Sequence, residues 1–177
     1  MIGVLMSFML TIPRAGRMRL TEFVVAPEGY VRERLPEDVP SSRVLIFGLE
    51  GEMFFGASSA LEHHFEEIES RLAPETEVVV LRLKRVHNPD AVGMAELDLF
   101  LDRMETLGVR VLLCGVRKYM LPVLERVGVV DRLGDGQVFL EQPVRQTSTA
   151  SAVAYAATLL QEGTGIGRQA RTAHEQG

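Results

Sequence analysis

Few residues of this 177-residue chain have the types and spacing that support chemistry, and the most informative ones surround a single loop. The loop joins a run rich in β-branched residues, Val78–Leu83, to apolar residues that recur at helical spacing from Met94 onward. Pro89 disfavours a helical conformation for the residue before it, and Asp90 can accept backbone N–H bonds and cap the helix. We therefore expect a binding or regulatory loop made of Asn88, Asp90, Ala91, Val92 and Gly93.

A second helix start offers a similar opportunity for binding. Ser59 and Glu62 have the spacing of a capping box, and small residues precede them. A helix N-terminus presents unpaired N–H groups and a partial positive charge, which suit an anion. An anion or partner contact is therefore expected at Gly56, Ser58 and Ser59. A small anion or a nucleotide phosphate could sit at this helix start or at Asp90–Gly93, although a helix end alone does not identify its ligand.

The motifs of common enzymes are missing from the sequence. It contains no Walker A loop, no GxGxxG after a strand, no CxxC, no HExxH and no GxSxG. Adjacent helical residues point about 100° apart, so His63 and His64 cannot share a metal ion. Cys114 follows the apolar run Val111–Leu113 and is interpreted as a core thiol. These patterns predict a protein that is not an enzyme and has no cofactor and no metal site.

The composition is that of a soluble globular domain, with 46% hydrophobic and 24% charged residues. A single cysteine rules out an internal disulfide and fits a reducing compartment. The net charge is −5, but residues 1–19 carry three arginines and no acid, so the remainder carries −8. An acidic body argues against a nucleic-acid partner.

The N-terminus is apolar in Met1–Ile12, after which Pro13 and three arginines follow. A dozen helical residues cover roughly 18 Å, less than the ~30 Å core of a bilayer. A signal peptide has the opposite order of charged and apolar residues. The segment is typical of the cytoplasmic end of a transmembrane helix. Alternatively, it folds onto the domain or onto a partner chain. Without a bilayer or a partner, so many adjacent apolar residues predict self-association, such as a homodimer through Met1–Ile12.

The remaining pattern predicts one α/β domain at residues 20–162, preceded by the apolar segment and basic linker of residues 1–19. The expected strands are residues 21–25, 43–49, 78–83, 109–115 and 137–140, with a further short strand near Tyr30 and a turn at Glu50-Gly51. The expected helices are about residues 59–72, 94–107, 121–127 and 147–160. Strands that alternate with helices imply a mixed, mainly parallel sheet of four to five strands with about four helices. Residues 163–177 are expected to be disordered.

The loop resembles the signature of the STAS domain, which anti-sigma-factor antagonists share with the cytoplasmic tails of sulfate-permease-type anion transporters. In that family a strand is followed by Asp, two small residues, of which the second is usually Ser or Thr, and Gly. Here the strand residues 81–86 are followed by Asp90-Ala91-Val92-Gly93. The order of elements agrees over about residues 20–162, and residues 43–59, with their Phe-Phe phrase, resemble the transporter branch. Two positions depart from the pattern: Val92 has no hydroxyl to phosphorylate, and Arg82 replaces an acid.

The resemblance implies a non-catalytic cytoplasmic regulatory or interaction domain of a sulfate-permease-type anion transporter, on the cytoplasmic face of the inner membrane. Its partner would be the membrane part of the transporter or another regulatory protein, and this chain would be a fragment or a truncated product. The alternative is a free-standing cytoplasmic signalling protein similar to anti-sigma-factor antagonists. Val92 argues against that alternative, because a kinase cannot phosphorylate a valine.

Overall fold

The computed structural model describes residues 18–39, 41, 43–53, 58–144 and 146–174. The described strands are β1 (Arg19–Val25), β2 (Val31–Glu33), β3 (Val44–Glu52), β4 (Val78–His87), β5 (Arg110–Val116) and β6 (Val138–Leu140). The described helices are α2 (Ser58–Ser70), α3 (Ala91–Thr106), α4 (Leu121–Arg126), α5 (Val129–Leu133) and α6 (Thr147–His174). None of these helices is both long and apolar enough to cross a bilayer.

The strands form a six-stranded mixed sheet in the order β2-β1-β3-β4-β5-β6. Strands β3 to β6 run parallel to one another, and β1 pairs antiparallel with both β2 and β3. The predicted α/β class, the parallel core and the early antiparallel pair are confirmed. The sheet has one strand more than the upper estimate from the sequence, because the three-residue β2 near Tyr30 joins it.

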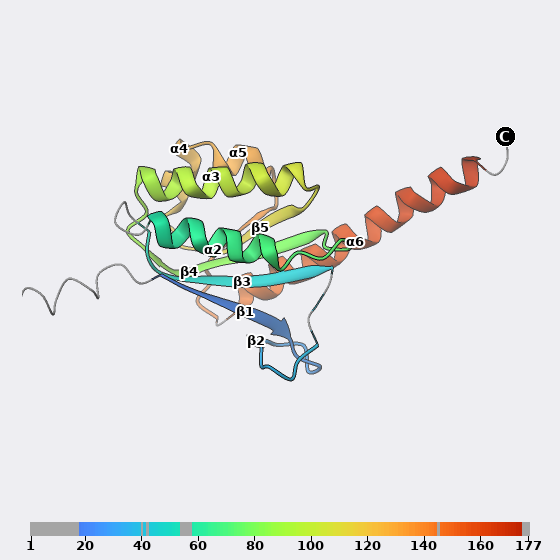
Figure 1. The fold of residues 1–177 in the computed structure, drawn as a ribbon, viewed down its shortest axis with the longest axis horizontal. Helices are drawn as coiled ribbons and strands as arrows, with labels where there is room; N and C mark the ends of the chain where they lie inside the picture. The colour runs from blue at the N-terminus through green and yellow to red at the C-terminus, as the bar shows by residue number, and fades with distance from the viewer. Residues whose placement is uncertain (1–17, 40, 42, 54–57, 145, 175–177) are drawn as a thin grey trace, which may run out of the picture.

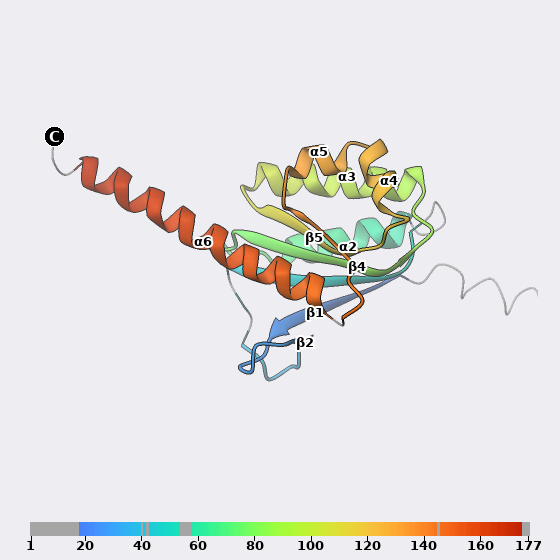
Figure 2. The same cartoon turned by 180° about the vertical axis from the view of Figure 1, so that it is seen from behind.

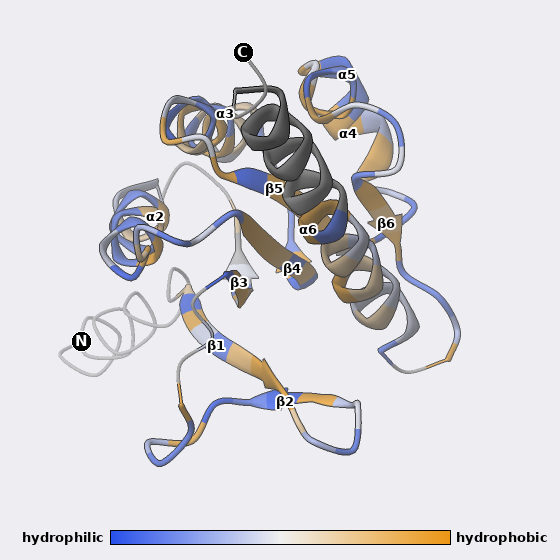
Figure 3. Cartoon of the chain, turned by 90° about the vertical axis from the view of Figure 1, so that its right-hand side faces the viewer, coloured by the Kyte–Doolittle hydropathy of each residue, from blue (hydrophilic) through white to orange (hydrophobic). Residues whose placement is uncertain are grey.

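Helices cover the two faces of the sheet unequally (Figures 1 and 2). On one face α2, α3, α4 and α5 bury the larger core, in which the rings of Phe65 and Phe100 stack with centroids 4.4 Å apart. On the other face α6 lies across the sheet alone and buries a smaller cluster around Val80 and Cys114. In Figure 3 the apolar ribbon of β4 lies between these two helix layers. Its side chains alternate between them, as the period of a strand requires.

At Glu50-Gly51 the structure has a continuous strand, β3, where the sequence predicted a turn. The strand continues to Glu52, and Gly51 and Glu52 pair with Val86 and His87 of β4. An irregularity between Gly48 and Glu50 absorbs the change of register. Pairing with a strand that lies about 35 residues further along the chain has therefore overridden the local preference for a turn.

The start of α2 also differs from expectation. Helix α2 begins at Ser58, so Ser59 lies inside its first turn and not at the capping position. Helix α6 extends to His174, and its last turns project away from the sheet (Figures 1 and 2). The disorder expected for residues 163–177 stays a prediction. The predictions for Met1–Ile12, Phe54-Phe55 and Gly56 lie outside the described residues.

Candidate functional site

The loop after β4 is held against the end of β3 by backbone hydrogen bonds. The Met53 amide donates to the His87 carbonyl at 2.8 Å, and the Asp90 amide donates to the Met53 carbonyl at 3.0 Å. Between them, Asn88 takes a positive φ of 46°, a conformation that asparagine tolerates better than most residues. The path of the loop is thus fixed at both ends by one residue, Met53, whose side chain is fully buried.

Asp90 caps α3 as the sequence predicted. Its extended backbone, with φ −110° and ψ 178°, places Oδ1 to accept hydrogen bonds from the amides of Val92 at 3.1 Å and Gly93 at 2.9 Å. The carboxylate therefore satisfies two of the N–H groups that a helix start leaves unpaired. It also places a negative charge where an anion would bind, so this helix end is a poor site for a small anion.

Gly93 is the position of the loop where an added side chain would be crowded. A Cβ built on it would lie 2.7 Å from Met53 Cγ and 3.0 Å from the Met53 carbonyl oxygen. Those distances are shorter than van der Waals contact, so glycine allows the first turn of α3 to approach the end of β3. The glycine of the signature is explained by this close approach.

The predicted loop residues differ in how much surface they offer to a partner. Asn88 and Ala91 are exposed, Asp90 and Val92 are half-buried, and Gly93 is buried. A partner can therefore touch the tip of the loop and the first residue of α3, while Gly93 acts through the packing beneath.

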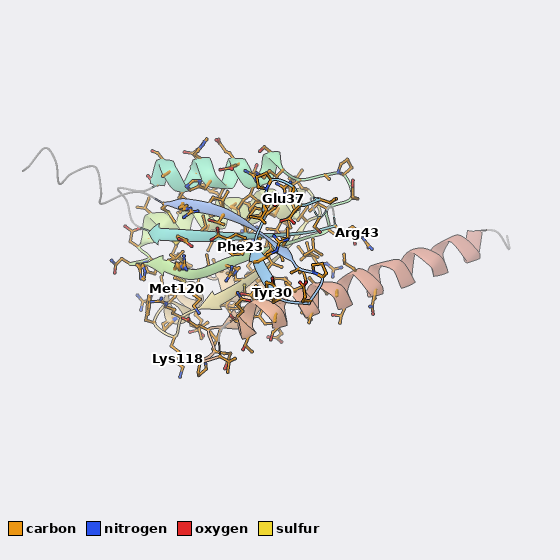
Figure 4. All side chains as sticks on the ribbon, turned by 90° about the horizontal axis from the view of Figure 1, so that it is seen from below. Phe23, Tyr30, Glu37, Arg43, Lys118 and Met120 are labelled. Carbon is orange, nitrogen blue, oxygen red and sulfur yellow. The ribbon has the colours of Figure 1, made fainter. Side chains whose placement is uncertain are left out.

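Other residues share this edge of the sheet. Helices α2 and α3 both start there, since each follows a parallel strand (Figure 1). On α2, Ser58 is half-buried and Ser59 is exposed. After β5, Lys118 is exposed at the same end of the molecule (Figure 4), and Tyr119, 49% exposed, donates its hydroxyl to the Val86 carbonyl at 3.0 Å. Neither residue was predicted from the sequence, although their place directly after a parallel strand is a usable signal.

The described cysteine and histidines lie in different surroundings. Within the part of the chain that the structure describes, no three His, Cys, Asp or Glu side chains are placed to hold a metal ion. Cys114 is fully buried, as expected for a core thiol, and burial raises its pKa to about 11. His63 is exposed, and His64 Nε2 lies 3.0 Å from the Met18 carbonyl oxygen.

Comparison with known proteins identifies the family. The family model of the STAS domain matches residues 36–147. A sulfate transporter family protein from Wolinella succinogenes is 30% identical, covers 71% of this chain and 93% of its own, and superposes with a TM-score of 0.56. The STAS domain of a SulP transporter from Vibrio cholerae is 24% identical over 70% of this chain and 88% of its own, with a TM-score of 0.53.

A larger transporter contains the same fold. The murine anion transporter Solute Carrier 26 family member A9 is 16% identical and superposes with a TM-score of 0.69 over 89% of this chain, which corresponds to 25% of the transporter. At that identity the likeness concerns the fold alone. The search of curated proteins gives no match.

Proposed function

Because the chain belongs to the STAS domain family, we propose that it is a non-catalytic regulatory and interaction domain of a sulfate-permease-type anion transporter. The observation that carries the proposal is the 30% identity to the sulfate transporter family protein, which extends over 93% of that chain. In this role the domain lies on the cytoplasmic face of the inner membrane and does not itself move the anion.

The partner surface in this proposal is the edge of the sheet where α2 and α3 begin. We call it the loop edge and define it by its exposed residues Ser59, Asn88, Ala91, Lys118 and Tyr119. The hydrogen bonds between Met53 and the loop hold its backbone in one conformation, which lowers the entropy that binding costs. The proposed occupant of the loop edge is the membrane part of the transporter.

Control of this interaction does not use phosphorylation at the loop. Val92 stands where the family pattern usually has Ser or Thr, and a valine side chain offers no oxygen for phosphoryl transfer. A negative charge introduced next to Val92 should nevertheless disturb a contact surface as a phosphate group does, since both place negative charge in an interface. This gives a test that does not depend on the natural mode of control.

The first experiment reads the genomic DNA upstream of the Met1 codon. A continuous frame that encodes several long apolar segments is expected. A stop codon and a ribosome-binding site immediately upstream would contradict the transporter assignment and favour the free-standing antagonist-like protein.

The second experiment measures sulfate uptake into vesicles that contain the whole transporter. Ala91→Glu places a charge on the exposed first residue of α3, where negative charge does not oppose the helix dipole. We expect a changed uptake rate at unchanged protein level. Ala154→Glu is the matched control, because Ala154 is an exposed helical residue on α6. Equal uptake by both variants and the unmodified transporter would contradict a regulatory role for the loop edge.

A further inference from the structure

A cavity of about 400 Å³ lies on the α6 side of the sheet, bounded by the β1–β2 hairpin, the second half of β4 and the start of α6. Figure 4 labels two of its lining residues, Phe23 on β1 and Tyr30 directly before β2. Its charged lining consists of Arg32, Glu33, Glu50, Arg82, Lys84 and Arg85. Asp38 and Glu141, which pair with Arg32 and Lys84, balance the four basic and two acidic side chains of this lining. What favours an anion in the cavity is therefore the placement of Arg82 and not a net positive charge.

Arg82 differs from the other cations of the cavity. Three of the four have a carboxylate partner, in the pairs Arg32–Asp38 at 2.5 Å, Lys84–Glu141 at 3.0 Å and Arg85–Glu50 at 2.6 Å. Within the described residues, Arg82 has no carboxylate within 4.0 Å. It is half-buried, and burial lowers its pKa, yet an arginine keeps its proton at any physiological pH. A partly desolvated cation without a counter-ion is costly, and a bound anion would offset that cost.

The Arg82 guanidinium is held in place before any ligand arrives. Its Nε donates to Thr149 Oγ1 of α6 at 3.1 Å, and its central carbon lies 4.0 Å from the centroid of the Phe23 ring. The ring in turn lies over Gly48, since a Cβ there would come within 2.7 Å of Phe23 Cε2. Neither Nη atom has an acceptor among the described residues, so the fork of the guanidinium is available to a ligand.

From this geometry we propose that the cavity binds a doubly charged tetrahedral oxyanion, such as sulfate or hydrogen phosphate, with Arg82 as its principal ligand. The planar fork of an arginine donates two parallel hydrogen bonds to such an anion, and the ion-paired side chains of Lys84 and Arg85 bring further N–H donors to the same cavity from the same strand. The site lies on the face of the sheet opposite to α2 and α3, away from the helix starts where the sequence suggested an anion. The proposal of this site does not depend on the transporter assignment, because anion binding is measured on the isolated chain.

The volume leaves room for the waters of a free anion or for an organic substituent on a phosphate. Tyr30, 52% exposed, offers a ring at the cavity wall on which an aromatic substituent can pack. The free anion and the phosphate monoester share the recognised chemistry, so the test includes both.

The test is a calorimetric titration of the full chain with sulfate, inorganic phosphate and phenyl phosphate, at constant ionic strength set with chloride. Constant ionic strength separates a specific site from screening. We expect saturable binding of at least one probe, and tighter binding of phenyl phosphate if the natural ligand is a monoester. Arg82→Gln should weaken binding about tenfold or more, since hydrogen bonds to charged groups carry that much affinity. Arg126→Gln, an exposed arginine on α4, is the matched control and should bind like the unmodified chain.

The location of binding is checked separately, in case Arg82→Gln does not fold. Amide NMR shifts of the unmodified chain should change at Gly48 and Thr149 on addition of the tightest probe and stay constant at Val92. Lys84→Gln, at a half-buried position, should bind about threefold more weakly through the loss of one nearby charge. Absence of saturable binding for all three probes, equal binding by folded Arg82→Gln, or shifts centred on Val92 would each overturn the proposal.

Discussion

Replacing Gly93 by alanine sets two opposing effects of known size against each other. Gly93 is the third residue of α3, where a glycine-to-alanine change gains up to ~1 kcal/mol of helix propensity. The added Cβ, however, would lie 2.7 Å from Met53 Cγ and 3.0 Å from the Met53 carbonyl oxygen. The side chain can move, but the carbonyl accepts a hydrogen bond from the Asp90 amide and the Met53 amide is bonded to His87. Overpacking of this kind costs about 1–3 kcal/mol, so the steric effect should dominate.

We expect Gly93→Ala to lower the free energy of unfolding by about 1–2 kcal/mol, which corresponds to a fall in Tm of roughly 3–6 °C for a chain of this size. Urea unfolding followed by circular dichroism measures the change, with an unaltered m-value showing that the unfolded state is the same. Ala95→Gly, at an exposed position of the same helix, reports the propensity effect alone and should cost about 0.5–1 kcal/mol. A Gly93→Ala chain that is as stable as the original, or more stable, would show that the loop does not need a close approach to Met53.

Three further predictions follow from the local geometry. Asp90→Ala should cost about 1 kcal/mol of stability in urea unfolding and Asp90→Ser much less, since serine also caps; equal losses would exclude a capping role. The pKa of Asp38 is lowered from 3.8 to about 2, chiefly by the hydrogen bond from Arg32, so the stability this group contributes is present above about pH 4 and lost as the pH falls toward 2. Urea midpoints between pH 2 and 5 should therefore depend less on pH in Asp38→Asn, and an unchanged slope would contradict this. Burial raises the pKa of Cys114 to about 11, so its thiol should react with iodoacetamide at pH 8 far more slowly in the folded than in the urea-unfolded chain; equal rates would refute the buried site.

The loop could be predicted from the sequence because its determinants are local. A β-branched strand, a proline and a capping carboxylate lie within about a dozen residues, and each acts on its immediate neighbours. Asp90 accordingly accepts hydrogen bonds from residues only two and three positions ahead. The Gly93 contact was beyond local reasoning, since Met53 lies 40 residues earlier and meets it only when β3 and β4 pair.

The errors in strand length have the same origin. The sequence ends β4 at Leu83, where polar residues begin, and turns β3 at Glu50-Gly51. Both strands continue because they pair with each other: Glu50, Gly51 and Glu52 of β3 face Arg85, Val86 and His87 of β4. Arg85 Nη1 and Glu50 Oε1 lie 2.6 Å apart across this pair. Backbone pairing between neighbouring strands does not require apolar side chains, so hydrophobic pattern alone underestimates strand length.

The cavity around Arg82 is assembled from residues that lie far apart in the sequence. Phe23, Gly48, Arg82 and Thr149 come from four elements, and their contacts join residues up to 67 positions apart. One signal was nevertheless present in β4. Side chains two apart share a face, so Val78, Val80, Arg82 and Lys84 continue along one row. The row changes from apolar to basic in the middle of β4, whose first four residues are buried. Since α6 covers Val78 and Val80, the change in the row marks where the helix stops covering the sheet and the cavity begins. A charge that continues the buried row of a central strand therefore indicates an opening in the covering layer, even when no binding motif is present.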